Sequence, residues 1–226
     1  MQTCLLVEGV GARLLVDCGA TSLVAMRRAG IDPTTIDALA LTHLHGDHFG
    51  GLPFLILDGQ FRRRSGTLTI AGPPGTRARV EAALEVFFPG STRVTRRFEL
   101  AFLDLSDGRS TRVGGMTVTA FAVVHASGAP AHALRIEHGA KVVVYSGDTE
   151  WTEGLAEACR DADLLLCEAY TYDRPVKFHL SHADVLAHRD ALRARRIVLT
   201  HMGPDMLARQ ADAAFECASD GLVIEV

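Results

Sequence analysis

Apolar residues occur along the chain in short runs that are separated by turns rich in glycine and aspartate. Thr3–Val7 and Arg13–Val16 predict the two strands of a hairpin, closed by the turn Gly9-Val10-Gly11. Between residues 20 and 90 the runs alternate between helical spacing and short buried strands. The elements expected there are a helix over Leu23–Ala29, a strand over Ile36–Leu41, a helix over Leu52–Leu57 that stops at Asp58-Gly59, a strand over Thr67–Ala71 and a helix over Arg77–Phe88.

From Phe98 onward the pattern is first β-rich and then alternates between helix and strand. The expected strands are Phe98–Leu105, Met116–Val124, Ala133–Glu137 and Lys141–Tyr145, and the alternating part comprises a helix over Gly154–Arg160, a strand over Asp163–Glu168, a helix over Ser181–Arg195, a strand over Ile197–Thr200, a helix over Met206–Ala218 and a strand over Leu222–Val226. Ser181 and Asp184 have the spacing of a capping box at the start of one helix. Two β-rich halves that each end in helices, without a low-complexity linker, predict a single α/β domain over residues 1–226. We expect two packed sheets with helices on their outer faces, in four layers.

Size and composition limit the classes of protein to consider. The chain has 226 residues, of which 48% are hydrophobic and 22% charged, as in a globular protein with a sizeable core. A formal charge of -4 gives no broad attraction to nucleic acid or to an anionic membrane. No apolar run approaches the roughly 20 residues of a membrane span, and the first residues lack the features of a signal peptide.

The five cysteines are odd in number, scattered and mostly flanked by apolar residues: Cys4, Cys18, Cys159, Cys167 and Cys217. Their spacing contains no CxxC pair, which argues against a cysteine metal site. We interpret them as reduced, buried side chains in a cytoplasmic protein.

Four side chains that can bind metal ions lie within six positions, in the stretch Thr42-His43-Leu44-His45-Gly46-Asp47-His48. This stretch follows an apolar run that predicts a buried strand. Residues two apart in an extended segment point to the same side, and the following glycines predict a tight turn into a helix. One strand-to-helix connection can therefore present two pairs of ligands to two neighbouring ions.

Other polar residues also follow predicted strands. His125, Asp148 and His201 each come at or just after the end of an apolar run. Functional side chains often lie on loops at strand ends, where a rigid sheet positions them. If these ends converge with the histidine cluster, the nitrogen and carboxylate ligands suit zinc, or else manganese or iron, and Asp148 is the natural candidate to bridge two ions.

The motif THLHGDH resembles the His-x-His-x-Asp-His signature of the metallo-β-lactamase superfamily. His125, the motif Ser146-Gly147-Asp148-Thr149 and the segment Leu199-Thr200-His201 resemble its remaining metal motifs, in the same order. The resemblance implies an αββα sandwich and two divalent metal ions. It implies His43, His45 and His125 on one ion, Asp47, His48 and His201 on the other, and Asp148 between them. His45 favours hydrolysis over redox chemistry, because the flavo-diiron members carry glutamate at that position.

A second resemblance concerns the branch of this superfamily. Leu166-Cys167-Glu168-Ala169, followed by His179-Leu180-Ser181, resembles the ribonuclease Z and cyclic phosphodiesterase branch. It implies that Glu168 orients His179, which helps to protonate the leaving oxygen. Only 22 residues, 126 to 147, separate His125 from Asp148, too few for the long arm with which ribonuclease Z clamps transfer RNA.

These motifs lead us to expect a metal-dependent hydrolase. The first hypothesis is a dinuclear phosphodiesterase that acts on a small cyclic or short phosphodiester, with a metal-bridging hydroxide as nucleophile and Asp47, Glu168 and His179 as catalytic residues. A carbonyl hydrolase, such as a lactonase, thioesterase or β-lactamase, fits the metal motifs equally well, but it does not need Glu168 and His179. A third alternative is a metal-binding protein without catalytic activity.

The expected partner is a small-molecule substrate. Arginine groups at Arg62-Arg63-Arg64 and Arg96-Arg97 could attract phosphates, but the negative net charge and the few aromatic residues disfavour extended nucleic acid. Relatives often have a further strand before Gln2. Its absence would expose the neighbouring strand and favour pairing with another chain, as in a homodimer.

Overall fold

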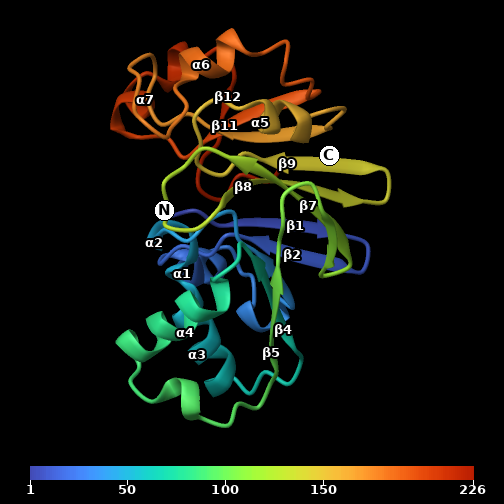
Figure 1. The fold of residues 1–226 in the computed structure, drawn as a ribbon, viewed down its shortest axis with the longest axis vertical. Helices are drawn as coiled ribbons and strands as arrows, with labels where there is room; N and C mark the ends of the chain where they lie inside the picture. The colour runs from blue at the N-terminus through green and yellow to red at the C-terminus, as the bar shows by residue number, and fades with distance from the viewer. The chain divides into compact units, whose positions relative to one another are not determined.

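The computed structural model describes residues 1–226, which form two compact units (Figure 1). The first unit comprises Met1–Leu105 and Arg112–Met116, and the second comprises Ser106–Thr111 and Thr117–Val226. Each unit is built on a mixed β-sheet with helices beside it, so the predicted α/β class is confirmed. The elements of both units follow mostly from the hydrophobic pattern.

The first sheet has five strands in the order β1-β2-β3-β4-β5. They are β1 (Leu5–Gly9), β2 (Ala12–Val16), β3 (Ala38–Ala40), β4 (Leu68–Gly72) and β5 (Leu100–Asp104). The predicted hairpin is present, with Leu5 paired to Val16 in antiparallel register. Strands β2 to β5 are parallel to one another, so β2 and β3 end side by side, with Val16 opposite Ala40. This register brings the segments after Val16 and Ala40 to the same edge of the sheet.

The helices of the first unit are α1 (Ser22–Arg28), α2 (Gly46–Phe49), α3 (Leu52–Phe61) and α4 (Thr76–Phe87), with short 3-10 turns at Pro33–Thr35 and Ser91–Arg93. Figure 1 shows α3 and α4 lying together beside β4 and β5. The prediction that α3 stops at Asp58-Gly59 is wrong, because both residues lie inside the helix. A Cβ atom at Gly59 would lie 3.3 Å from the ring of Phe98, so this glycine allows close packing and does not end the helix.

The second sheet has seven strands in the order β12-β11-β10-β9-β8-β7-β6. They are β6 (Ser110–Val113), β7 (Met116–Val123), β8 (Ala131–His138), β9 (Lys141–Tyr145), β10 (Leu164–Glu168), β11 (Arg196–Thr200) and β12 (Glu216–Cys217). β9, β10 and β11 are parallel. β7 and β9 each pair antiparallel with β8, so β7 runs in the same direction as β9. Four strands of this sheet, β7, β9, β10 and β11, therefore end at the same edge.

The helices of the second unit are α5 (Glu153–Ala158), α6 (His182–Ala187) and α7 (Pro204–Ala208), with a 3-10 turn at Gln210–Asp212. The capping box of Ser181 and Asp184 is present. The helix predicted to continue to Arg195 is much shorter, because His188 stacks on Trp151 and Leu192 is buried, and the chain then turns into β11.

The prediction is also wrong near the C-terminus. Instead of a helix to Ala218, the chain forms α7, the 3-10 turn and then β12, which pairs with β11. Phe215 and Cys217 pack against the core of the second unit at a spacing of two, which suits a strand. The strand expected over Leu222–Val226 is absent, and β6 was not predicted because its exposed, polar residues leave almost no pattern.

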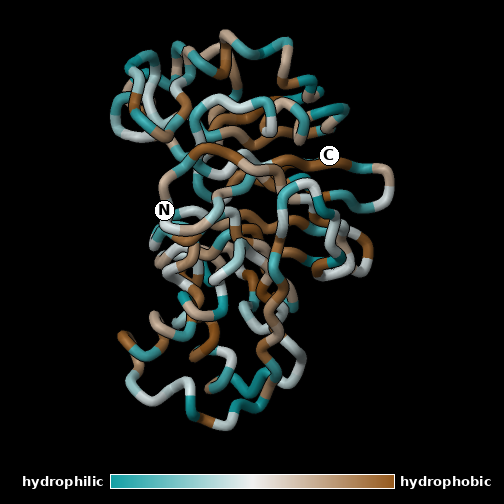
Figure 2. The backbone as a smooth tube through the Cα atoms, in the orientation of Figure 1, coloured by the Kyte–Doolittle hydropathy of each residue, from teal (hydrophilic) through white to brown (hydrophobic).

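Figure 2 shows hydrophobic residues concentrated in the strands, with hydrophilic residues in most of the turns. β3 is buried along its whole length, as are Val144 and Tyr145 of β9. None of the helices combines the length and the apolar character that crossing a membrane requires.

Candidate metal centre

In the first unit, Asp17 organises the histidine cluster. It follows β2, is fully buried, and adopts a positive φ of 55°. Its Oδ1 accepts the backbone N–H of Thr42 at 2.8 Å, and its Oδ2 accepts the hydroxyl of Thr42 at 2.8 Å and the Nδ1–H of His48 at 2.7 Å. These three bonds tie the end of β2 to the segment after β3. A carboxylate can only accept, so they also fix where the protons of its partners lie.

The orientation of His43 follows from the same network. The hydroxyl of Thr42 donates its one hydrogen bond to Asp17, so its Oγ1, 3.0 Å from Nδ1 of His43, accepts a hydrogen bond from that nitrogen. For both His43 and His48, Nδ1 therefore carries the proton, and Nε2 is the nitrogen that suits a metal ion. This arrangement of imidazoles is typical of metal ligands.

The remaining cluster residues surround the start of α2, a short helix that begins directly after His45, where the sequence predicted only a tight turn. The rings of His43 and His45 are 5.0 Å apart, and those of His43 and His48 are 4.0 Å apart. Nε2 of His48 lies 3.6 Å from Oδ2 of Asp47. The structure thus brings together all four residues of the predicted cluster.

Two glycines allow the backbone of this region to pack tightly. A Cβ atom at Gly19 would lie 2.2 Å from the carbonyl oxygen of Asp47, and one at Gly51 would lie 2.3 Å from the carbonyl oxygen of Gly19. Only glycine fits at such distances. The loop after β2 and the histidine loop therefore contact each other backbone to backbone, which fixes the position of Asp17 relative to His48.

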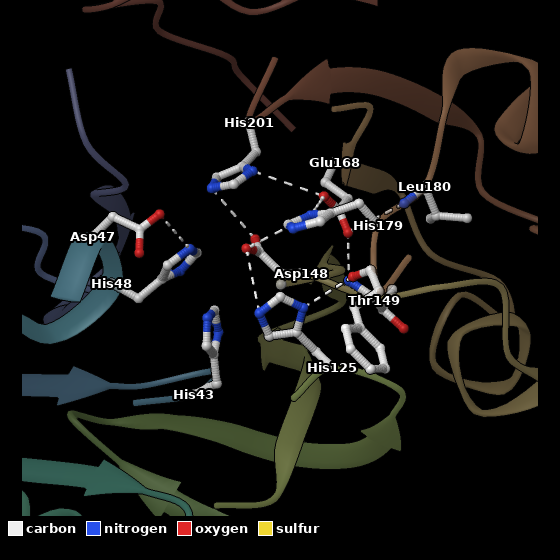
Figure 3. Close-up of polar contacts among 12 residues, drawn as sticks. His43, Asp47, His48, His125, Asp148, Thr149, Glu168, His179, Leu180 and His201 are labelled. Carbon is white, nitrogen blue, oxygen red and sulfur yellow. Dashed lines mark hydrogen bonds and ion pairs between the residues drawn. The ribbon is translucent and has the colours of Figure 1, made fainter. Parts of the chain in front are cut away.

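In the second unit, Asp148 lies between three imidazoles (Figure 3). Its Oδ2 is 3.8 Å from Nε2 of His125 and 3.9 Å from Nδ1 of His179, and its Oδ1 is 3.5 Å from Nε2 of His201. His125, Asp148 and His201 follow the strands β7, β9 and β11, which end at the same edge of the sheet, and His179 lies in the segment between β10 and α6. The parallel course of β9, β10 and β11, and the matching direction of β7, thus explain why residues far apart in sequence meet here.

The two oxygens of Asp148 each face the Nε2 atom of a different histidine. Two ligands that each lie about 2.1 Å from one ion, at a tetrahedral angle, are roughly 3.4 Å apart. The distances from Asp148 to His125 and His201 are close to this value, and the side chains of His125 and Asp148 are only 4% and 3% exposed. The geometry fits a carboxylate that bridges two ions.

His125 is oriented by a backbone carbonyl. Its Nδ1 donates to the carbonyl oxygen of Phe178 at 2.9 Å, which again makes Nε2 the nitrogen suited to an ion. His201 has a positive φ of 52°, an unusual conformation for a residue other than glycine. Strained backbone of this kind is typical of functional sites, where the surrounding structure maintains it.

Glu168 and His179 form the contact that the second resemblance implies. Nδ1 of His179 is 2.8 Å from Oε2 of Glu168, which is fully buried at the end of β10. The other oxygen of Glu168 accepts the backbone N–H groups of Thr149 and Leu180. The carboxylate is therefore held in place, and it fixes the ring of His179, whose side chain is 18% exposed.

Burial, together with the neighbouring carboxylate of Asp148, raises the pKa of Glu168 well above its ordinary value. Two acidic groups that lie close together in a buried site repel each other when both are ionised. The ligand atoms of Asp148, Glu168, His179 and His201 lie within 4.8 Å of one another. A cation beside Asp148 would relieve this repulsion, so the donor set fits metal ions.

Sequence reasoning missed Asp17 and Tyr170. Asp17 could have been recognised from the sequence, because an acidic residue directly after the apolar run Leu14-Leu15-Val16 needs hydrogen-bond donors around it. Tyr170 could not, because its role depends on contacts with residues far along the chain. Its ring stacks on that of His179 with centroids 4.7 Å apart, and a Cβ atom at Gly203 would lie 3.2 Å from the Tyr170 ring.

Comparison with known proteins decides the family. A family model described as the β-lactamase superfamily domain matches residues 12–202, which is most of the chain. The chain belongs to the metallo-β-lactamase superfamily. A ribonuclease Z from Bradyrhizobium diazoefficiens is 31% identical over 251 residues, covering 88% of this chain and 82% of the relative.

Two solved structures show the metallo-β-lactamase fold of this chain. The metallo-β-lactamase fold protein YhfI from Bacillus subtilis is 24% identical to this chain, with a TM-score of 0.78. The match covers 100% of this chain and 92% of the YhfI chain. The short form of human tRNase Z is 22% identical with a TM-score of 0.80 and the same coverage. The predicted fold class and the resemblance to the ribonuclease Z branch are confirmed.

The chain is a metal-dependent hydrolase of the metallo-β-lactamase superfamily, with histidine and aspartate clusters suited to metal ions. The structure places every residue of the predicted ligand set in one of the two groups described above. His43, His45, Asp47 and His48 lie together in the first unit, and His125, Asp148 and His201 lie together in the second. Their assignment to individual ions stays a prediction.

Proposed function

We propose that this protein is a dinuclear phosphodiesterase that acts on a small cyclic or short phosphodiester. The observation that carries this proposal is the buried carboxylate of Glu168, which orients His179 beside Asp148. Hydrolysis of a phosphodiester needs a proton for the departing alkoxide, and a fixed imidazole can supply it. Similarity to a ribonuclease Z, an enzyme class named for cleaving RNA, supports the same reaction class.

The seven ligands divide between two sites in this proposal. His43, His45 and His125 would hold one ion, Asp47, His48 and His201 would hold the second, and Asp148 would serve both. Zn²⁺ suits this mixture of imidazole and carboxylate best, with Mn²⁺ or iron as the alternatives. When bound, two such ions neutralise the charge on the phosphate and activate a water molecule near neutral pH.

The chain's own residues handle the protons of the reaction. The carboxylate of Asp47, whose side chain is 41% exposed, accepts the proton of the attacking water as the new bond to phosphorus forms. Glu168 holds the Nδ1–H of His179, so the imidazolium form of His179 donates its other proton, the one on Nε2. That proton goes to the departing oxygen as its bond to phosphorus breaks. Glu168 keeps the imidazole in the orientation that this transfer requires.

The surroundings of the site favour a small substrate. The connection between β7 and β8 contains only residues 124 to 130, and β8 and β9 are joined by a tight hairpin, so no arm extends from the 22 residues after His125. We propose a small-molecule substrate, with extended nucleic acid disfavoured. We further propose that the two units act as one domain, that the protein forms a homodimer, and that it works in the cytoplasm, where its five free cysteines stay reduced.

A substrate panel combined with metal analysis tests this proposal. The panel contains bis(p-nitrophenyl) phosphate, a lactone, a thioester and a cephalosporin. We expect turnover of the phosphodiester, a loss of about 100-fold in kcat on His179→Ala, and unchanged metal content in that variant.

The matched control is His138→Ala at the hairpin between β8 and β9, the opposite end of the sheet from Asp148, which should keep full activity. Turnover of only the carbonyl substrates would identify a carbonyl hydrolase and refute the proposal. Loss of metal together with activity in His179→Ala would make that residue structural.

A further inference from the structure

Phe178, directly before His179, has an unusual backbone conformation. Its φ is +70°, in the left-handed region that favours glycine. A bulky residue stays in this conformation only when the surrounding contacts maintain it. The contacts of Phe178 therefore show what holds the segment that carries His179.

Two polar side chains hold the backbone of Phe178, one at each end of the residue. Its N–H donates to Oε1 of Glu150 at 2.7 Å, and its carbonyl oxygen accepts from Nδ1 of His125 at 2.9 Å. The N–H of His179 donates to the carbonyl oxygen of Val176 at 3.1 Å and closes a tight turn. One strained residue thus connects His125 with His179, and Glu150 is the charged group that anchors it.

Glu150 is itself well placed for this role. It follows Asp148 and Thr149 directly, and its backbone N–H donates to the carbonyl oxygen of Val124 at 3.1 Å, next to His125. Its side chain therefore reaches the turn from a point fixed between the ends of β7 and β9. A hydrogen bond from a backbone N–H to a carboxylate is stronger than one between neutral groups.

We propose that Glu150 is a positioning residue of the metal centre. By holding Phe178 in its left-handed conformation, it keeps the Phe178 carbonyl on His125 and keeps His179 facing Asp148. The effect on His179 rests on the proposed phosphodiesterase function, whereas the effect on His125 concerns metal binding alone. Replacing a surface glutamate without this role would change neither metal binding through His125 nor the position of His179.

The test compares Glu150→Ala, Glu150→Gln and the control Glu153→Ala, an exposed glutamate three residues along the chain. Zn²⁺ affinity is measured by chelator competition, and kcat and KM are measured with bis(p-nitrophenyl) phosphate. Loss of a group that supports a metal ligand typically lowers metal affinity or activity by about 10- to 100-fold. We expect such a loss in Zn²⁺ affinity and in kcat for Glu150→Ala, with KM little changed.

Glu150→Gln separates positioning from a general structural effect. Its amide oxygen can still accept the Phe178 N–H, so affinity and kcat should stay within about threefold of the wild type. Wild-type Zn²⁺ affinity and kcat in Glu150→Ala would overturn the proposal, as would equal losses in Glu150→Gln and Glu150→Ala. If the wild type does not cleave the phosphodiester, the proposed function fails, while the Zn²⁺ affinities still decide the role of Glu150.

Discussion

Replacing Asp17 should separate the stability of the first unit from its ability to bind metal. In Asp17→Ala the N–H and hydroxyl of Thr42 and the Nδ1–H of His48 lose their acceptor inside a fully buried site. Each buried group without a partner costs about 1–3 kcal/mol, so the three together should lower the free energy of unfolding by about 3–9 kcal/mol. This variant should be both unstable and poor at binding metal.

Asp17→Asn is the more informative change. Asparagine tolerates the positive φ of this position, and its oxygen can still accept the N–H of Thr42. Its amide nitrogen, however, replaces the acceptor that faces His48, so Nδ1 of His48 must accept a hydrogen bond instead of donating one. The ring then carries its proton on Nε2, the nitrogen that would coordinate an ion.

We therefore expect Asp17→Asn to unfold at a urea concentration near that of the wild type but to bind one of the two ions about 10- to 100-fold more weakly. Urea unfolding of the metal-free protein and a Zn²⁺ titration measure the two quantities. Asp58→Asn is the matched control, because Asp58 is also largely buried and instead accepts from Arg27. Unchanged affinity for both ions in Asp17→Asn would refute the tautomer argument.

Two further predictions concern the second unit. Tyr170→Ala should lower kcat about 10-fold because the ring of His179 loses its stacking partner. Tyr170→Phe keeps the ring and should keep the wild-type kcat. Equal losses of kcat in both variants would assign the effect to the hydroxyl group. Burial, and to a lesser extent Arg209, lowers the pKa of His182, whose Nε2 accepts the N–H of Ala214 at 3.0 Å. The unfolded chain therefore takes up the proton first, so the stabilisation is complete above about pH 6.5 and is lost as the pH falls. His182→Gln keeps an acceptor that cannot titrate. Urea unfolding at pH 5.5 and 7.5 should therefore show that the free energy of unfolding falls less between these two pH values in His182→Gln than in the wild type. An equal fall in both proteins would contradict this explanation.

The histidine cluster could be predicted because its information is local. Four ligands within six residues, after an apolar run, define a strand, a turn and a site together. The residues at the strand ends could be predicted for a related reason, since parallel strands bring their carboxyl ends to one edge. Glu168 and His179 needed the resemblance to known proteins, because their spacing alone does not indicate a pair.

The features that were missed depend on contacts between distant segments. The residues after Ala187 have good helix propensity, yet the stacking of His188 on Trp151 and the burial of Leu192 end α6 early. The left-handed conformation of Phe178 is likewise imposed by Glu150 and His125, and nothing in the phenylalanine itself indicates it. Local pattern fails where tertiary contacts outweigh local preference.

A metal titration of activity tests whether two bound ions are needed for phosphodiester cleavage. Protein stripped with a chelator is reloaded with increasing Zn²⁺, and turnover of bis(p-nitrophenyl) phosphate is followed against the ratio of metal to chain. We expect no turnover without metal and a maximum at two ions per chain. A maximum at one ion per chain, or no phosphodiester turnover at any ratio, would contradict it.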